Sequence, residues 1–133
     1  MTAPVKKPWR VALGAQSRKA GRTGEAWAAA WLMLKGYQIL GFRLKAGRGD
    51  IDLLARRGRV LAVVEVKRRA TPELALESLM PDQRDRLLTA ARTLMARRKG
   101  LANLELRLDV VALSPGRWPR HFRGLIVDGA SVG

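Results

Sequence analysis

Residues 49–67 read GDIDLLARRGRVLAVVEVK, and this stretch decides the fold. The apolar run at residues 60–64 has no polar side, which is typical of a central strand covered on both faces. The pair Arg57–Gly58 predicts a two-residue reversal between a strand at residues 50–56 and a strand at residues 60–67. The sequence therefore predicts an antiparallel hairpin in the middle of a sheet.

The rest of the chain supplies helices and further strands on either side of this hairpin. Helical signals run from Ser17, a suitable N-cap, to Gly36, a suitable residue to follow the last turn. Further strands are predicted at residues 37–45, 104–113 and 122–127, and further helices at residues 73–79 and 81–99. This order predicts an α/β fold with a mixed central β-sheet flanked by helices.

The first predicted helix is apolar on more than one side. Trp27, Trp31 and Leu34 share one face at helical spacing. Ala28, Ala29 and Leu32 make another side apolar, so we expect the later turns of this helix to be covered on most sides.

The charge of the chain points to a polyanionic partner. It carries 26 Lys and Arg against 11 Asp and Glu, a formal net charge of +15. Such a surplus costs self-repulsion, and each phosphate contact made by a basic side chain releases condensed counterion. Nucleic acid is the leading candidate, with a merely solubilising surface as the alternative. A membrane-surface role is disfavoured because the basic residues do not form one amphipathic face.

Composition also excludes several kinds of site. The chain has no cysteine and a single histidine, His121, which removes disulfides, thiolate zinc sites and multi-histidine metal sites. The longest apolar run, residues 26–34, is far shorter than the roughly 20 residues that cross a bilayer. No apolar segment of a secretory signal is visible, so we expect a cytoplasmic protein. We also expect a flexible basic arm at residues 1–16 and a single domain at residues 17–133.

Carboxylates occur where apolar residues dominate. Three of the 11 acidic residues lie between Asp50 and Glu65, and buried carboxylates are costly unless they meet a cation or several hydrogen bonds. With a two-residue loop at residues 57–58, Asp50 faces Glu65, and Asp52 is a diagonal neighbour of Glu65. Lys67 then projects from the same side of the sheet. A three-residue loop would send Glu65 and Lys67 to the opposite side.

The grouped side chains have the chemistry of a phosphodiester-cleaving metal site. Asp52 and Glu65 offer hard oxygen ligands, which suit Mg²⁺ or Mn²⁺. Lys67 could hold the attacking water or neutralise charge on a phosphate. The alternative is a cross-strand ion pair at an exposed edge, which would contribute little energy. Apolar neighbours such as Leu53 and Val64 favour an interior position.

Four segments, in order along the chain, carry a resemblance: GRTGEAWAAAWLMLKGYQIL, GRGDIDLLARRGRVLAVVEVKRR, RDRLLTAARTLM and LRLDVVAL. They resemble the YraN-type uncharacterised family, a branch of the restriction-endonuclease-like PD-(D/E)xK nuclease superfamily. The resemblance covers about residues 21–127 and implies a restriction-endonuclease-like fold. The chain departs from the family pattern at Asp50, where glutamate is usual, and at Gln83, where lysine is common.

The resemblance also implies roles for individual residues. Asp52 and Glu65 would bind Mg²⁺ or Mn²⁺, and Lys67 would be the catalytic lysine. Glu25 would be an additional acid that orients water or a second metal; the local alternative for it is an ion pair with Arg22. We expect phosphate contacts from six basic residues: Arg43, Lys45, Arg48, Arg68, Arg69 and Arg84. The partner would be nucleic acid, with DNA favoured. Resolvase-like relatives often dimerise, which makes a homodimer a further expectation, although no dimer seam is visible.

Three further residues each have two interpretations. Asp109 resembles a late aspartate of the family, and a buried hydrogen-bonding role is the alternative. His121 is expected at the surface or against a phosphate. Trp118 could stack on a base, or pack against its own loop.

The leading hypothesis is a nucleic-acid-binding protein with Mg²⁺-dependent endonuclease activity on DNA. The alternatives are a non-catalytic DNA- or RNA-binding module with the same fold, and an adaptor whose basic face meets an acidic protein. Metal-dependent cleavage separates the first from the others. The salt dependence of nucleic-acid binding separates the second from the third.

Overall fold

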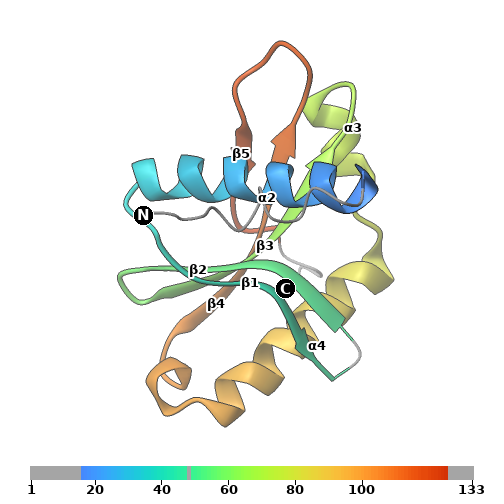
Figure 1. The fold of residues 1–133 in the computed structure, drawn as a ribbon. Helices are drawn as coiled ribbons and strands as arrows, with labels where there is room; N and C mark the ends of the chain where they lie inside the picture. Colours follow the sequence, from blue (N-terminus) through green and yellow to red (C-terminus); the bar gives the residue numbers. More distant parts are fainter. Residues whose placement is uncertain (1–15, 48, 126–133) are drawn as a thin grey trace.

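The computed structural model describes residues 16–47 and 49–125, and its elements form one sheet between helices (Figure 1). The helices are α2 (Gln16–Leu34), α3 (Pro72–Glu77), α4 (Pro81–Arg97) and the short 3₁₀ helix η2 (Lys99–Leu101). The strands are β1 (Gln38–Ala46), β2 (Gly49–Arg57), β3 (Val60–Arg68), β4 (Glu105–Leu113) and β5 (Arg120–Phe122). Their order across the sheet is β1-β2-β3-β4-β5.

The sheet is mixed, as predicted. β1, β2 and β3 pair antiparallel, β3 and β4 pair in parallel, and β4 and β5 pair antiparallel. A parallel neighbour needs a crossover connection, and α3 with α4 supplies it between β3 and β4. The α/β fold is confirmed, and its arrangement is consistent with a restriction-endonuclease-like architecture. No helix of the described segments is long and apolar enough to span a bilayer.

The central hairpin turns one residue later than predicted. Arg57 pairs with Val60, so the two loop residues are Gly58 and Arg59. Gly58 has a φ of +60°, which fits the first central position of a type II′ turn, where glycine is preferred. The predicted pairing of Asp50 with Glu65 is therefore wrong by two residues. Because side chains alternate with a period of two, that shift leaves Glu65 and Lys67 on the same face as Leu54, as predicted.

The last strand also differs from its prediction. β5 covers Arg120–Phe122 rather than residues 122–127, and its Phe122 pairs with Val110 of β4. Residues 126 and 127 lie outside the described residues, as do residues 1–15 of the predicted basic arm, whereas Gln16 already belongs to α2.

Two apolar layers cover the two faces of the sheet, with α2 and α4 on opposite sides (Figure 1). On the α4 side, Leu61 and Val63 of β3 belong to one buried cluster with Leu87 of α4. On the α2 side, Leu53 and Val64 belong to another cluster that includes residues of α2. β3 is therefore covered on both faces, as its uniformly apolar run predicts.

The apolar face that α2 buries is the alanine face. Ala28, Ala29 and Leu32 are buried, whereas Trp27 is 52% exposed and Leu34 is exposed as well. The expectation that the later turns would be covered on most sides is wrong. Alanine side chains let a helix approach a sheet closely, and helical periodicity alone cannot choose between two apolar faces. Trp31 instead stacks on Trp118, with ring centroids 5.9 Å apart.

Candidate functional site

Asp52 is held by the backbone of the neighbouring strand. The paired residues of β2 and β3 end at Leu53 and Val64, and Asp52 comes immediately beyond that pair. Its Oδ2 accepts a hydrogen bond of 2.9 Å from the backbone N–H of Val66. Ile51 and Leu54 both pack on the α4 side although they are three residues apart, so strict alternation breaks between them. This irregularity positions the Asp52 carboxylate against β3.

Glu65 and Lys67 meet Gln83 of α4. Both side chains lie on the face of β3 that α4 covers, because they are two residues apart. Gln83 Nε2 donates to Glu65 Oε2 at 2.9 Å, and Lys67 Nζ donates to Gln83 Oε1 at 3.4 Å. Lys67 Nζ also lies 3.3 Å from Glu65 Oε2. Pro81 begins α4, so Gln83 sits in its first turn. The amide thus holds the glutamate and the lysine in one arrangement.

The two carboxyl groups lie close together. The pKa of each depends on the other as well as on burial. Burial, and after it the charge of Asp52, raises the pKa of Glu65 to about 7, although Lys67 opposes this rise. Burial also raises the pKa of Asp52, although hydrogen bonds from Val66 and Glu65 act against it. A divalent cation bound by both carboxyl groups would favour their charged forms and lower both pKa values.

The acids line a pocket of about 640 Å³ on the α4 side of the sheet. Its lining residues are Gly49, Asp50, Asp52, Glu65, Gln83, Arg86 and Leu87. The predicted grouping of Asp50, Asp52 and Glu65 thus opens into one space. Gly49 allows the close approach of β2 to α4, because an added Cβ would lie 2.9 Å from the carbonyl oxygen of Arg86.

The donor set for a metal ion is small. Among residues 16–47 and 49–125, no cluster of three or more His, Cys, Asp or Glu side chains could hold a metal ion. Asp52 and Glu65 remain as two adjacent carboxylates. Mg²⁺ is commonly bound by one or two carboxylates, with waters and substrate phosphates completing its octahedron, so the residues present fit such an ion.

Glu25 lies outside this pocket. It is buried on α2, and its Oε1 accepts a 2.9 Å hydrogen bond from Arg43 Nε. Arg43 has a φ of +50°, and its charge helps to lower the pKa of Asp52 against the effect of burial. Glu25 is thus connected to the surroundings of Asp52 through Arg43. The side chain of Arg22, the alternative partner of Glu25, is outside the described part of the molecule.

The predicted phosphate-binding residues fall into three groups. Arg43 and Lys45 are exposed on β1, and Arg68 and Arg69 are exposed where β3 ends. Arg84 is half-buried on α4 and donates to the carbonyl of Leu79. Arg48 lies outside the described residues.

Two pocket residues were missed as site residues. Arg86 lines the pocket, and Gln83 was noted only as a departure from the family pattern. Their spacing of three on a helix that follows the hairpin places them on one helical face. That spacing is the only sequence signal for them, and it does not reveal which strand they meet.

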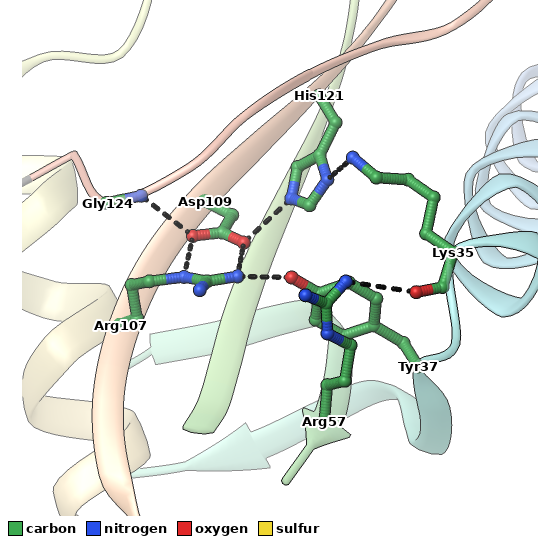
Figure 2. A network of polar contacts seen from close by, with 7 residues as sticks. All are labelled: Lys35, Tyr37, Arg57, Arg107, Asp109, His121 and Gly124. Carbon is green, nitrogen blue, oxygen red and sulfur yellow. Dashed lines mark hydrogen bonds and ion pairs between the residues drawn. The ribbon is translucent and has the colours of Figure 1, made fainter. Parts of the chain in front are cut away.

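Asp109 belongs to a separate, structural network (Figure 2). It is fully buried on β4, where Arg107 binds both its oxygens at 2.8–2.9 Å, and the backbone N–H of Gly124 donates to Oδ1. Burial alone would raise the pKa of Asp109, but the donors from His121, Arg107 and Gly124 outweigh it and lower this pKa. Its acceptor sites are occupied, so the hydrogen-bonding interpretation is the one the geometry supports.

His121 is buried in this network rather than exposed to solvent or phosphate as predicted. Its side chain is 1% exposed, and its Nε2 lies 2.7 Å from Asp109 Oδ2. Lys35 Nζ lies 2.7 Å from Nδ1 (Figure 2). Because an ammonium group can only donate, His121 accepts at Nδ1 and donates its Nε2 proton to Asp109. Arg57 closes the network by donating to the carbonyl of Lys35 at 3.0 Å.

Comparison with known proteins agrees with the resemblance. Residues 24–113 match the model of the uncharacterised protein family UPF0102. A UPF0102 protein of Caulobacter vibrioides is 58% identical over 112 residues, which are 84% of this chain and 90% of the relative. A UPF0102 protein of Maricaulis maris is 47% identical over 117 residues, 88% of this chain and 92% of the relative. The chain belongs to the UPF0102 family, the YraN-type family that its segments resemble.

Proposed function

We propose that this protein is a metal-dependent phosphodiesterase that cleaves nucleic acid, with DNA as the favoured substrate. The observation that carries the proposal is the Asp52–Glu65 pair, two carboxyl groups from adjacent strands that line one pocket, with Lys67 3.3 Å from Glu65. A purely structural ion pair has no need for a second buried acid, whose burial is costly.

Asp52 and Glu65 are the residues that would hold Mg²⁺ or Mn²⁺. Both are hard oxygen donors, and burial raises the pKa of each, an effect that a bound cation would oppose by favouring the charged forms. When bound, the ion would polarise a phosphoryl oxygen and lower the pKa of a water molecule. We also assign the backbone carbonyl of Val66 as a further oxygen donor.

Lys67 supplies the cation of the site. Its ammonium group is held by Glu65 and Gln83, so its position is set before substrate binds. There it can orient the attacking water, or stabilise the charge that builds on the phosphate in the transition state. Glu25 acts in this proposal as a positioning residue, because it holds Arg43 rather than lining the pocket.

Substrate binding follows from the surplus of positive charge. The net charge of +15 favours any polyphosphate, and Arg86 reaches the lining of the acid pocket itself. Exposed Arg68 and Arg69, where β3 ends, extend the basic surface beyond Lys67. Such contacts are independent of base sequence, and they predict binding that weakens steeply with salt.

The test is a cleavage panel on duplex, single-stranded and four-way-junction DNA with Mg²⁺ or Mn²⁺. We expect Lys67→Ala and Asp52→Asn each to lower the cleavage rate by about 100-fold or more, whereas Glu77→Gln, an exposed acid on α3, leaves it unchanged. A wild-type protein that binds neither ion and cleaves none of these substrates would refute the proposal.

The second candidate is a non-catalytic nucleic-acid-binding module. It is favoured by the small set of side-chain ligands, because no third His, Cys, Asp or Glu among the described residues completes a metal-binding cluster with Asp52 and Glu65. It predicts that log affinity for duplex falls by about 0.9 per neutralised phosphate and that divalent metal has no specific effect. Retained binding with no cleavage, in the panel above, would select it.

A further inference from the structure

A second hollow lies on the other face of the sheet, beside α2. It has a volume of about 580 Å³ and is lined by residues from α2, from the ends of β3 and β4, and from the β4–β5 loop. The lining residues that matter here are Trp27, Arg68, Leu113, Ser114, Arg117 and Trp118. Leu113 belongs to the buried cluster on the α2 side, whereas the acid pocket is on the α4 side.

Trp118 presents an aromatic face to this hollow. Its side chain is 73% exposed, and its ring stacks on Trp31 with an interplanar angle of 23°. Stacking on one side fixes the orientation of the indole while leaving most of its surface in water. Trp27, itself about half exposed, lines the same hollow. Exposed aromatic surface of this kind is a mark of a binding site.

Ser114 adds an unsatisfied hydrogen-bonding group. It is 9% exposed, and its Oγ has no hydrogen-bond partner in the part of the chain that the structure describes. Buried polar atoms are nearly always partnered, so an orphaned hydroxyl lining a hollow indicates a ligand that would complete it. A serine hydroxyl can both donate and accept, which suits the polar edge of a nucleobase.

The charged residues of the hollow identify the rest of the ligand. Arg68 and Arg117 line it, and guanidinium groups bind phosphate through paired hydrogen bonds. An aromatic plane, a free hydroxyl and two arginines match a nucleobase with its phosphate. In a duplex both faces of each base are covered by stacking, so only an unpaired or extruded base can reach Trp118.

The last residues of β3 contribute to both hollows, Glu65 to one and Arg68 to the other. Glu65 and Lys67 project toward α4, whereas Arg68, the next residue, lines the hollow beside α2. Three residues of strand span about 10 Å, so Glu65 and Arg68 are within reach of one short nucleic-acid strand. We propose that the hollow beside α2 binds an unpaired nucleobase, and that the substrate is therefore single-stranded or locally unpaired nucleic acid.

This proposal rests on the proposed function for its polymer, but its test uses binding alone. A dye-labelled 15-nucleotide oligo-dT and a duplex of the same length are titrated with protein in EDTA, and affinity is read by fluorescence anisotropy. We expect Trp118→Ala to weaken single-strand binding by about 5- to 150-fold. Binding to duplex should change less than twofold, because its phosphate contacts are retained.

Three further variants test whether a loss of single-strand affinity comes from the hollow itself. Trp118→Phe should restore most of the single-strand affinity, since it returns an aromatic plane, and Ser114→Ala should weaken single-strand binding by a smaller factor. Phe42→Ala is the matched control, because Phe42 is a half-exposed aromatic on β1 that does not line the hollow. It should leave both affinities unchanged. Melting temperatures of all variants check that the fold is intact.

The failures of the two proposals are distinguishable. Unchanged single-strand affinity in Trp118→Ala, or an equal loss for single strand and duplex, would overturn the nucleobase site even if metal-dependent cleavage were found. A selective loss of single-strand affinity would support the site even if no substrate were cleaved. Tight binding of a protein segment to the hollow, with no effect of Trp118→Ala on oligo-dT, would also overturn it.

Discussion

Replacement of Glu65 by glutamine should change how stability depends on pH in the absence of metal. The pKa of Glu65 is raised by burial and by Asp52 from 4.5 to about 7. Between these two values the folded protein binds more protons than the unfolded chain does. Stability therefore falls as the pH rises through this window, and the loss is complete above about pH 8. Glu65→Gln removes the titrating group and, with it, this loss.

The magnitude follows from the width of the window. A rise in pKa from 4.5 to about 7 corresponds to about 3 kcal/mol, at about 1.36 kcal/mol for each pH unit. The stability of Glu65→Gln relative to wild type should therefore increase by about 3 kcal/mol between pH 4.5 and pH 8. For a domain of this size, that amounts to a difference in Tm of about 10 °C.

The assay is thermal unfolding followed by circular dichroism at several pH values in EDTA. Glu77→Gln, an exposed glutamate on α3, is the matched control, and its profile should run parallel to wild type. Adding Mn²⁺ at about 100 times its Kd should restore about 2.7 kcal/mol to wild type at pH 8 but not to Glu65→Gln. Parallel profiles for wild type and Glu65→Gln in EDTA would refute the reasoning.

Three more outcomes are expected. Asp109→Ala should destabilise the fold by about 3–5 kcal/mol in urea unfolding, because it leaves half-buried Arg107 and the buried ring of His121 without their partner; a loss below 1 kcal/mol would contradict this. The pKa of Asp109 is lowered in the folded state, so its carboxylate stabilises the fold fully above about pH 3.9, the pKa of an aspartate in the unfolded chain. This stabilisation is lost as the pH falls further, and acid unfolding of wild type compared with Asp109→Asn measures the loss. Gly49→Ala should cost about 1–3 kcal/mol in the same urea assay, since its Cβ would lie 2.9 Å from the Arg86 carbonyl oxygen, whereas Gly100→Ala, where nothing lies within 4 Å, should be close to neutral.

The hairpin separates what pattern reasoning could predict from what it could not. The two strands, their faces and the grouping of acids followed from alternation and from a turn signal. The loop itself lies at Gly58 and Arg59, because glycine takes the left-handed position that the turn requires. The predicted grouping of Asp52 with Glu65 still holds, because misplacing the loop moved the strand register by two residues. A shift by one residue would have put the two side chains on opposite faces of the sheet.

The first helix shows the limit of periodicity. Its sequence has two apolar faces, which predicted that the later turns would be covered on most sides. Tertiary packing buried Ala28 and Ala29 and left Trp27 half exposed. His121 shows the same limit for polar residues. Its neighbours in sequence are basic, which indicates a surface position, but Asp109 and Lys35 enclose its ring.

By itself, the sequence determined the strand and helix order, the two-faced central strand, the basic surplus and the acids that lie where apolar residues dominate. These properties depend on neighbours a few positions apart, whose directions the backbone geometry sets. Tertiary structure alone decided that Gln83 would hold Glu65 from 18 positions away and that Lys35 would reach His121 from 86 positions away. It also decided which carboxyls are buried and which donors they meet, and hence that the pKa rises at Glu65 but falls at Asp109. Burial and long-range contact arise from how whole layers pack, and local periodicity does not specify that packing.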